Sequence, residues 1–216
     1  EKTVTERAVK LTELGMEAAR SGLELRPLGG GSKWVDDARG KFKGKVLCTG
    51  EGGNGLECDF IPDAKSGATA TFWMRRNDSA GNKWDGIVAR FGKSRAFAIT
   101  ASWGLLHFGG KGWQRVGDDK WRLYAISLSP LDGAGEATAS FYVDGRKEAS
   151  VTAKPPKEGQ FIFAKTGNDS AMGCHFRDLR LYSRTLSDDE IHALGGAVPA
   201  EIPRVIPLRG GHHEIG

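Results

Sequence analysis

The chain has 216 residues, a net charge of +4 and 39% hydrophobic residues. Its apolar runs fall short of the roughly 18 residues that a membrane span needs, and its basic residues are scattered singly instead of clustered in a nucleic-acid-binding stripe. Composition therefore argues against membrane insertion and nucleic-acid binding. The 31 Gly residues and many short apolar runs favour one domain rich in strands.

The sequence begins at Glu1 without an initiator Met. A processed or excised segment would begin in this way. We therefore expect a secreted, periplasmic or cell-surface protein.

Residues 3–20 predict a helix. Thr3 and Glu6 have the spacing of a capping box, and Gly22 would end the segment. Apolar residues recur on one broad face of it, namely Val4, Ala8, Leu11, Leu14, Ala18 and Ala19. We expect residues 1–22 to form a helical arm that packs on the domain or on a neighbouring domain, with a dimerising helix as the alternative.

The chain then changes to strands and turns. The run TASFYVDGRKEASV predicts a hairpin, with Asp144 and Gly145 supplying the positive φ angles of a two-residue turn. WRLYAISLS predicts a half-buried strand with Tyr124, Ile126 and Leu128 on one face. AFAIT and LLHF predict a second hairpin with an exposed tryptophan at its tip.

The last strand and helix are predicted from FRDLRLYS and SDDEIHAL. Ser187 would cap the helix with Glu190 completing the box, and Gly195 and Gly196 would end it. Residues 195–216 contain three prolines and no regular period, so we expect an extended tail.

Three cysteines leave two interpretations open. Cys48 and Cys58 flank the glycine-rich run TGEGGNGLE, so a hairpin could bring them together for one disulfide, with Cys174 left over. All three could equally be buried small hydrophobic residues.

The run CHFRDLRLYSRTLSDDEIHAL resembles the closing strand and helix of bacterial laminin-G-like domains of the concanavalin-A-like superfamily. The matching positions are Phe176, Asp178, Leu179, Arg180, Leu181, Tyr182, Arg184, Leu186, Ser187, Glu190 and Ile191. ATATFWMRR, WRLYAISLS and FYVDGRKEAS are similar to earlier strands of that family and occur in the family's order. Arg177 departs from the pattern, because the family usually has an acid there.

This resemblance implies an all-β fold, a jelly-roll sandwich of two antiparallel sheets over residues 23–194. The helical arm and the short C-terminal helix would flank it. Such domains are commonly carbohydrate-binding or protein-binding modules of secreted or surface proteins. Many of them hold a structural calcium ion with oxygen ligands. The segment WVDDARGKFKG is similar to the family's metal-binding segment, which makes Asp36 or Asp37 a candidate calcium ligand together with Asp178. The alternative is that these aspartates cap turns.

Catalysis is the weaker hypothesis. Polysaccharide hydrolysis requires two carboxylates that face one groove, and the one suitable spacing, Glu57 and Asp59, suits a solvent-facing pair better. For a lyase, nothing in the sequence brings His107, Tyr124 and His175 together.

Tryptophans are the leading candidates for carbohydrate contact, because an aromatic ring can lie against the apolar face of a sugar. Trp73 and Trp121 lie in predicted strands and are expected to be core. The candidate ligand-binding residues in apparent loops are Trp84, Asp85, Trp103, Trp113 and Arg115, with Asn82 and Arg90 as possible neighbours. Each of these tryptophans could instead pack its own loop onto the sandwich.

We therefore expect a non-catalytic carbohydrate-binding module, and the basic surplus suits an anionic glycan. A protein-interaction or structural domain that docks neighbouring domains is the alternative. A polysaccharide-cleaving enzyme is the third reading.

Overall fold

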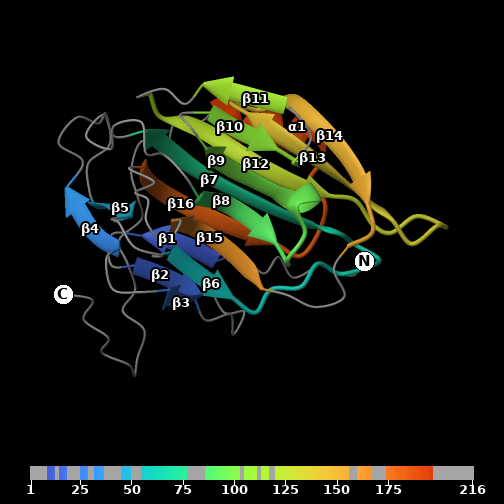
Figure 1. Ribbon diagram of the computed structural model, residues 1–216, viewed down its shortest axis with the longest axis horizontal. Coiled ribbons are helices and arrows are strands. Elements are labelled where there is room, and N and C mark those ends of the chain that lie inside the picture. Colours follow the sequence, from blue (N-terminus) through green and yellow to red (C-terminus); the bar gives the residue numbers. More distant parts are fainter. Residues whose placement is uncertain are drawn as a thin grey trace.

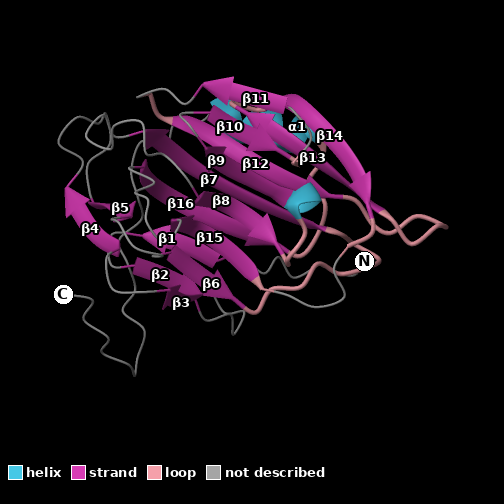
Figure 2. Cartoon of the chain, viewed as in Figure 1, coloured by secondary structure: helices cyan, strands magenta, loops and turns pink. Residues whose placement is uncertain are grey.

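The computed structural model describes residues 9–12, 15–18, 25–28, 32–36, 45–49, 55–76, 86–102, 105–110, 113–116, 120–155, 160–166 and 174–196. Two antiparallel seven-stranded sheets lie face to face as a jelly-roll sandwich (Figure 1). Strands account for most of the described chain, and one α-helix lies near its C-terminal end (Figure 2). The predicted all-β fold is confirmed.

Sheet I has the strand order β11-β10-β9-β8-β15-β6-β3. The bounds of these strands are β11 Trp113–Val116, β10 Leu105–Phe108, β9 Ala98–Ser102, β8 Gly86–Phe91, β15 Phe161–Thr166, β6 Gly55–Cys58 and β3 Leu25–Leu28. A 3-10 turn, η2 (Arg95–Phe97), joins β8 to β9.

Sheet II has the strand order β14-β13-β12-β7-β16-β5-β4. The bounds are β14 Arg146–Ala153, β13 Ala137–Val143, β12 Arg122–Leu128, β7 Ala68–Arg76, β16 Cys174–Tyr182, β5 Lys45–Thr49 and β4 Ser32–Asp36. The helix α1 (Asp188–Gly196) follows β16.

Phenylalanines fill the space between the sheets. The largest fully buried side chains are Phe72, Phe91, Phe97, Phe108, Phe141, Phe161, Phe163, Phe176 and Met74. The ring of Phe163 lies 5.0 Å from those of Phe72 and Phe176, both in edge-to-face geometry. Because Phe163 belongs to sheet I and the other two to sheet II, these contacts join the two layers.

The N-terminal helix prediction is wrong for the part that the structure describes. β1 (Val9–Thr12) and β2 (Gly15–Ala18) form an antiparallel pair in which Thr12 stands opposite Gly15. Glycine inside a helix costs about 1 kcal/mol relative to alanine, and β-branched residues such as Val9 and Thr12 favour strands. β1 also lies against β16, and this contact favours the strand.

The hairpin predicted at Asp144 and Gly145 is confirmed. β13 and β14 pair up to Val143 and Arg146, and the two turn residues have φ angles of 50° and 78°. Asp144 also accepts hydrogen bonds from Arg122 Nη1 at 2.6 Å and from the Leu123 amide at 3.0 Å. The turn is therefore anchored to the start of β12.

The strand predicted from WRLYAISLS is β12, but it is buried on both faces. Tyr124, Ile126 and Leu128 point into the core between the sheets, as expected. On the opposite face, Ala125 packs in a second cluster with Ile191 of α1. Because the helix covers this part of sheet II, the strand that was expected to be half-buried has no solvent-exposed face here.

The C-terminal helix begins as predicted. The Glu190 amide donates to Ser187 Oγ at 3.2 Å, and Glu190 Oε2 accepts from the Ser187 amide at 2.8 Å, which completes the capping box. Arg184 Nη2 also donates to Glu190 Oε1 at 2.7 Å. The predicted tail beyond residue 196 lies outside the described residues.

Cys48 and Cys58 do not form the hairpin that the sequence suggested. Cys48 lies in β5 of sheet II, whereas Cys58 lies in β6 of sheet I. Cys58 and Cys174 are fully buried, in keeping with the alternative of small hydrophobic residues.

Replacing Gly145 with Ala tests how the hairpin supports α1. Alanine at position 145 would have to adopt a positive φ angle, and its Cβ would stand 2.7 Å from His192 Cα in the backbone of the helix. We expect the free energy of unfolding to fall by about 2 kcal/mol, measured by urea denaturation. Gly133→Ala is the matched control, because nothing lies within 4 Å of its Cβ position. Equal losses in the two variants would contradict this account.

The ion pair at the start of α1 predicts an acid-dependent stability. Hydrogen bonds from Arg184, and then from the Ser187 amide, lower the pKa of Glu190 from 4.5 to about 2. This contribution is complete above pH 4.5 and is lost as the pH falls toward 2. Because the Glu190 side chain is 43% exposed, this contribution to the free energy of unfolding is about 1 kcal/mol or less.

Glu190→Gln keeps a capping partner but removes the charge. We expect its stability deficit relative to the parent protein to shrink between pH 5 and pH 2, measured by urea denaturation at each pH. A deficit that stays constant across this range would show that the charge contributes nothing.

Candidate functional site

The outer face of sheet I is set by strand alternation. Phe91, Ile99 and Leu106 are fully buried in the core. Their chain neighbours Arg90, Thr100 and His107 are partly exposed. Since successive side chains of a strand point to opposite faces, these three lie on the outside of β8, β9 and β10.

These outward residues line a groove of about 560 Å³. The described residues that border it are Gly86, Ile87, Arg90, Arg95, Thr100, Ala101, Ser102, Leu105, His107 and Gly110. Register places Ile87, Thr100 and His107 in one row across the three strands. The volume is in the range of sites that hold small ligands.

Positive charge distinguishes this groove. Arg90 and Arg95 both line it, and none of the described residues around it is acidic. Burial lowers the pKa of Arg90, and the nearby positive charge of Arg95 lowers it further. The Nε of Arg90 is buried and has no hydrogen-bond partner among the described residues. The groove therefore offers guanidinium, imidazole and hydroxyl groups to a ligand.

Three of the predicted ligand residues are adjacent in sequence to residues that line the groove. Trp84 and Asp85 come directly before Gly86, and Trp103 stands between the groove residues Ser102 and Leu105. All three lie outside the described residues. The predicted hairpin itself is confirmed, because Ser102 pairs with Leu105.

The other two predicted ligand residues lie in β11, at the edge of sheet I. Trp113 stands opposite Phe108, and Arg115 stands opposite Leu106. The groove-lining His107 instead faces Gln114 across the ladder. Their role in binding stays a prediction.

Arg95, Thr100 and Ser102 are groove residues that the sequence-based candidates do not include. From the sequence, His107 is a candidate only for the lyase alternative. The signal that could have found them is the hairpin of AFAIT and LLHF, whose alternation places Thr100 and His107 on one face.

The two tryptophans expected in the core differ. Trp73 is buried in β7, as predicted. Trp121 is partly exposed, with the Arg75 guanidinium 5.5 Å from its ring centroid. This cation–π contact, and not full burial, describes the place of Trp121.

The residues considered for catalysis do not converge. Tyr124 is in the core between the sheets, His107 is on the outside of sheet I, and His175 belongs to sheet II. His175 Nδ1 lies 2.9 Å from Arg75 Nη2. Glu57 is partly exposed and Asp59 is exposed, and Gln160 Nε2 donates to Asp59 Oδ1 at 3.4 Å.

The carboxylate of Asp178, a predicted calcium ligand, is paired with an arginine. Both of its carboxylate oxygens accept hydrogen bonds from Arg180, at 3.1 Å from Nε and 2.7 Å from Nη2. Within the described ranges, no three His, Cys, Asp or Glu side chains cluster as metal ligands. Asp36 lies in β4, and Asp37 lies outside the described residues. The calcium expectation, with Asp36, Asp37 and Asp178 as its candidate residues, stays a prediction.

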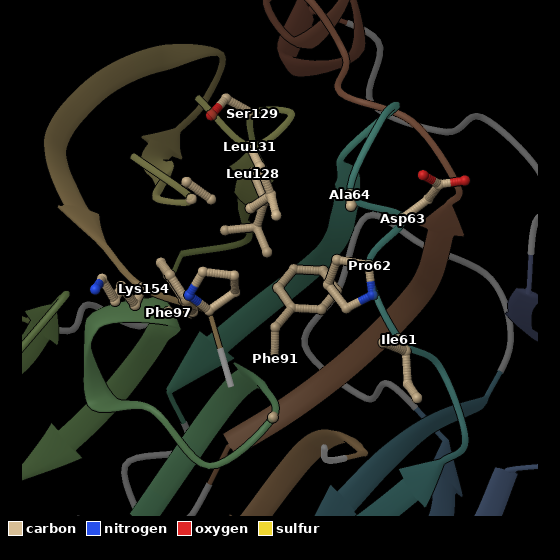
Figure 3. Close-up of a pocket in the computed structure, with 14 residues that line it drawn as sticks. Ile61, Pro62, Asp63, Ala64, Phe91, Phe97, Leu128, Ser129, Leu131 and Lys154 are labelled. Carbon is tan, nitrogen blue, oxygen red and sulfur yellow. The ribbon is translucent and has the colours of Figure 1, made fainter. Parts of the chain in front are cut away.

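A second hollow, of about 370 Å³, lies at one end of the sandwich. Figure 3 shows Phe91, Leu128 and Pro62 around it, with the carboxylate of Asp63 directed away. The two exposed large hydrophobic side chains of the described residues, Ile61 at 62% and Leu131 at 38%, border it. Its mainly apolar lining offers few of the hydrogen-bonding groups that a sugar needs.

The fold and the groove define an antiparallel β-sandwich with a concave polar site on one sheet. A family model described as the concanavalin A-like lectin/glucanases superfamily matches residues 51–192. The chain belongs to this superfamily, which confirms the resemblance inferred from its strands.

Solved structures support the same fold. The binding domain of botulinum neurotoxin serotype D is 12% identical with a TM-score of 0.59, and the match covers 88% of this chain and 50% of that one. The binding domain of Paraclostridial Mosquitocidal Protein 1 is 15% identical with a TM-score of 0.62, covering 87% and 51%. This chain therefore spans about half the length of these structures.

Two further searches found nothing. No curated protein matches the sequence. Within the described part of the chain, no helix has the length and apolar character needed to cross a membrane.

Proposed function

We propose that this chain is a carbohydrate-binding module of a secreted or cell-surface protein, and that its glycan lies in the groove on the outer face of sheet I. The observation that carries the proposal is the set of hydrogen-bonding side chains on β8, β9 and β10 that line a groove of suitable size. Arg90, Thr100 and His107 offer donors and acceptors to sugar hydroxyls. Superfamily membership is consistent with a lectin role.

The position of the tryptophans in the sequence adds support. Trp84 and Trp103 belong to segments attached to the groove residues Gly86, Ser102 and Leu105. An aromatic ring beside a polar groove is the usual arrangement for holding a sugar, because the ring packs on the apolar face of the pyranose. The described lining contains no Phe, Tyr or Trp, so we assign stacking to these two tryptophans.

Binding is favoured over hydrolysis by the composition of the groove. Glycoside hydrolysis uses two carboxyl groups, roughly 5 to 10 Å apart, on either side of the scissile bond. The described groove residues include neither Asp nor Glu. We therefore propose recognition without cleavage.

A protein-interaction module is the second candidate, favoured by the apolar hollow at the end of the sandwich. Ile61 and Leu131 expose apolar surface at its border, and exposed apolar surface commonly marks a contact with another protein. This reading would leave the polar groove without a role.

Thr100→Trp tests the proposed function. Thr100 is partly exposed at the centre of the groove row, so an indole there would fill the space intended for a sugar ring. We expect at least a tenfold loss of affinity, about 1.4 kcal/mol, for any polysaccharide that the parent protein binds on a glycan array. Isothermal titration calorimetry with that polysaccharide would give the affinity.

Thr152→Trp is the matched control, because Thr152 is an exposed strand threonine on β14 of the other sheet. It should bind as the parent protein does. Unchanged binding in Thr100→Trp, or release of reducing ends from the bound polysaccharide, would overturn the proposal.

A further inference from the structure

We propose that Arg90 and Arg95 form an anion subsite within the groove, which selects glycans that carry carboxylate or sulfate groups. This inference rests on the proposed function and names the ligand class of the same site. The shared chemistry is an anionic oxygen pair or triad on a sugar, which the forked donors of guanidinium groups match.

Arg90 is held on an apolar floor. Its neighbours in register are Ala98 on β9 and Ile162 on β15, and both of these side chains are buried. Neither can neutralise a guanidinium. The aliphatic stem of an arginine packs well on such a surface while its charged end remains available.

Arg95 is positioned by the 3-10 turn η2. Ser94 caps this turn by accepting a hydrogen bond from the Ala96 amide at 3.2 Å, and the fully buried Phe97 anchors it to the core. On the other side, a Cβ at Gly110 would stand only 3.3 Å from Arg95 Cβ, so the turn after β10 lies against this residue. The backbone that presents Arg95 is thus fixed from two directions.

Three arginines of the described chain are matched with carboxylates. Arg122 pairs with Asp144, Arg180 with Asp178 and Arg184 with Glu190, all within 2.7 Å. The groove instead brings two arginines together without a described acid around them. Burial, and then the positive charge of Arg95, lower the pKa of Arg90, which is consistent with this arrangement. A bound anion would relieve the repulsion between the two groups, which gives an acidic ligand an advantage over a neutral one.

Matched polysaccharides separate charge from sugar recognition. Polygalacturonate and its methyl-esterified form differ by a carboxylate, and dextran sulfate and dextran differ by a sulfate. We expect at least one acidic polymer to bind about tenfold or more tightly than its neutral form, measured by isothermal titration calorimetry. The preferred pair distinguishes carboxylate from sulfate. The preference should weaken steeply between 50 and 300 mM NaCl, because screening reduces it.

Arg95→Gln is the principal variant, because Arg95 is exposed and its loss should leave the fold intact. We expect it to weaken acidic-polymer binding about tenfold. Arg90→Lys keeps the charge but removes the fork, and should weaken binding by a smaller factor. Arg146→Gln is the control, since it removes the same charge from an exposed position on β14 of sheet II.

Three results are informative. Weakening by Arg95→Gln but not by Arg146→Gln supports the subsite. If acidic and neutral polymers bind equally, Thr100→Trp abolishes this binding and Arg95→Gln does not change it, the subsite is overturned. The proposed function would then still stand. Failure of every glycan to bind, or binding that Thr100→Trp leaves intact, would overturn both.

Discussion

The packing of phenylalanines between the two sheets determines what the rest of the molecule can present. Phe72, Phe163 and Phe176 lock the layers together at ring distances of 5.0 Å, and this fixes the inward set of each strand. Because the side-chain period of a strand is two, the outward set is then fixed as well. The row of Thr100 and His107 is the reverse side of the core made by Ile99 and Leu106.

The sandwich has two different outer faces. On sheet II, Leu186, which precedes α1, and Ile191 of α1 pack against Ala125, Tyr142 and Tyr182, so part of that face is a second small core. On sheet I, the corresponding surface over β8–β10 carries a polar groove. The helix thus covers part of the outer face of sheet II, whereas the groove proposed for recognition lies on sheet I.

Features set by a few neighbouring residues could be predicted from the sequence. The Asp144–Gly145 turn and the Ser187–Glu190 capping box depend on local chemistry, and both are present. The expected helix at residues 3–20 failed in its described part, because pairing of β1 with β2 and contact with β16 outweigh the local pattern. Burial of both faces of β12 depends on a helix some 60 residues later in the chain, which periodicity in one strand cannot reveal.

The candidate site was only partly predictable for a similar reason. The sequence indicates Arg90 as a possible ligand-binding neighbour of the loop tryptophans. Arg95 and Thr100 line one groove with His107 only through the register of three strands and the turn η2. Another constraint of this kind joins Gly145 to Gly195, where a Cβ on Gly195 would stand 2.6 Å from the Gly145 nitrogen. Glycine has the smallest side chain, so neither position can become smaller to accommodate a Cβ at the other. In related proteins the two glycines should therefore persist or disappear as a pair, which makes them a marker in sequence of whether this helix is still docked.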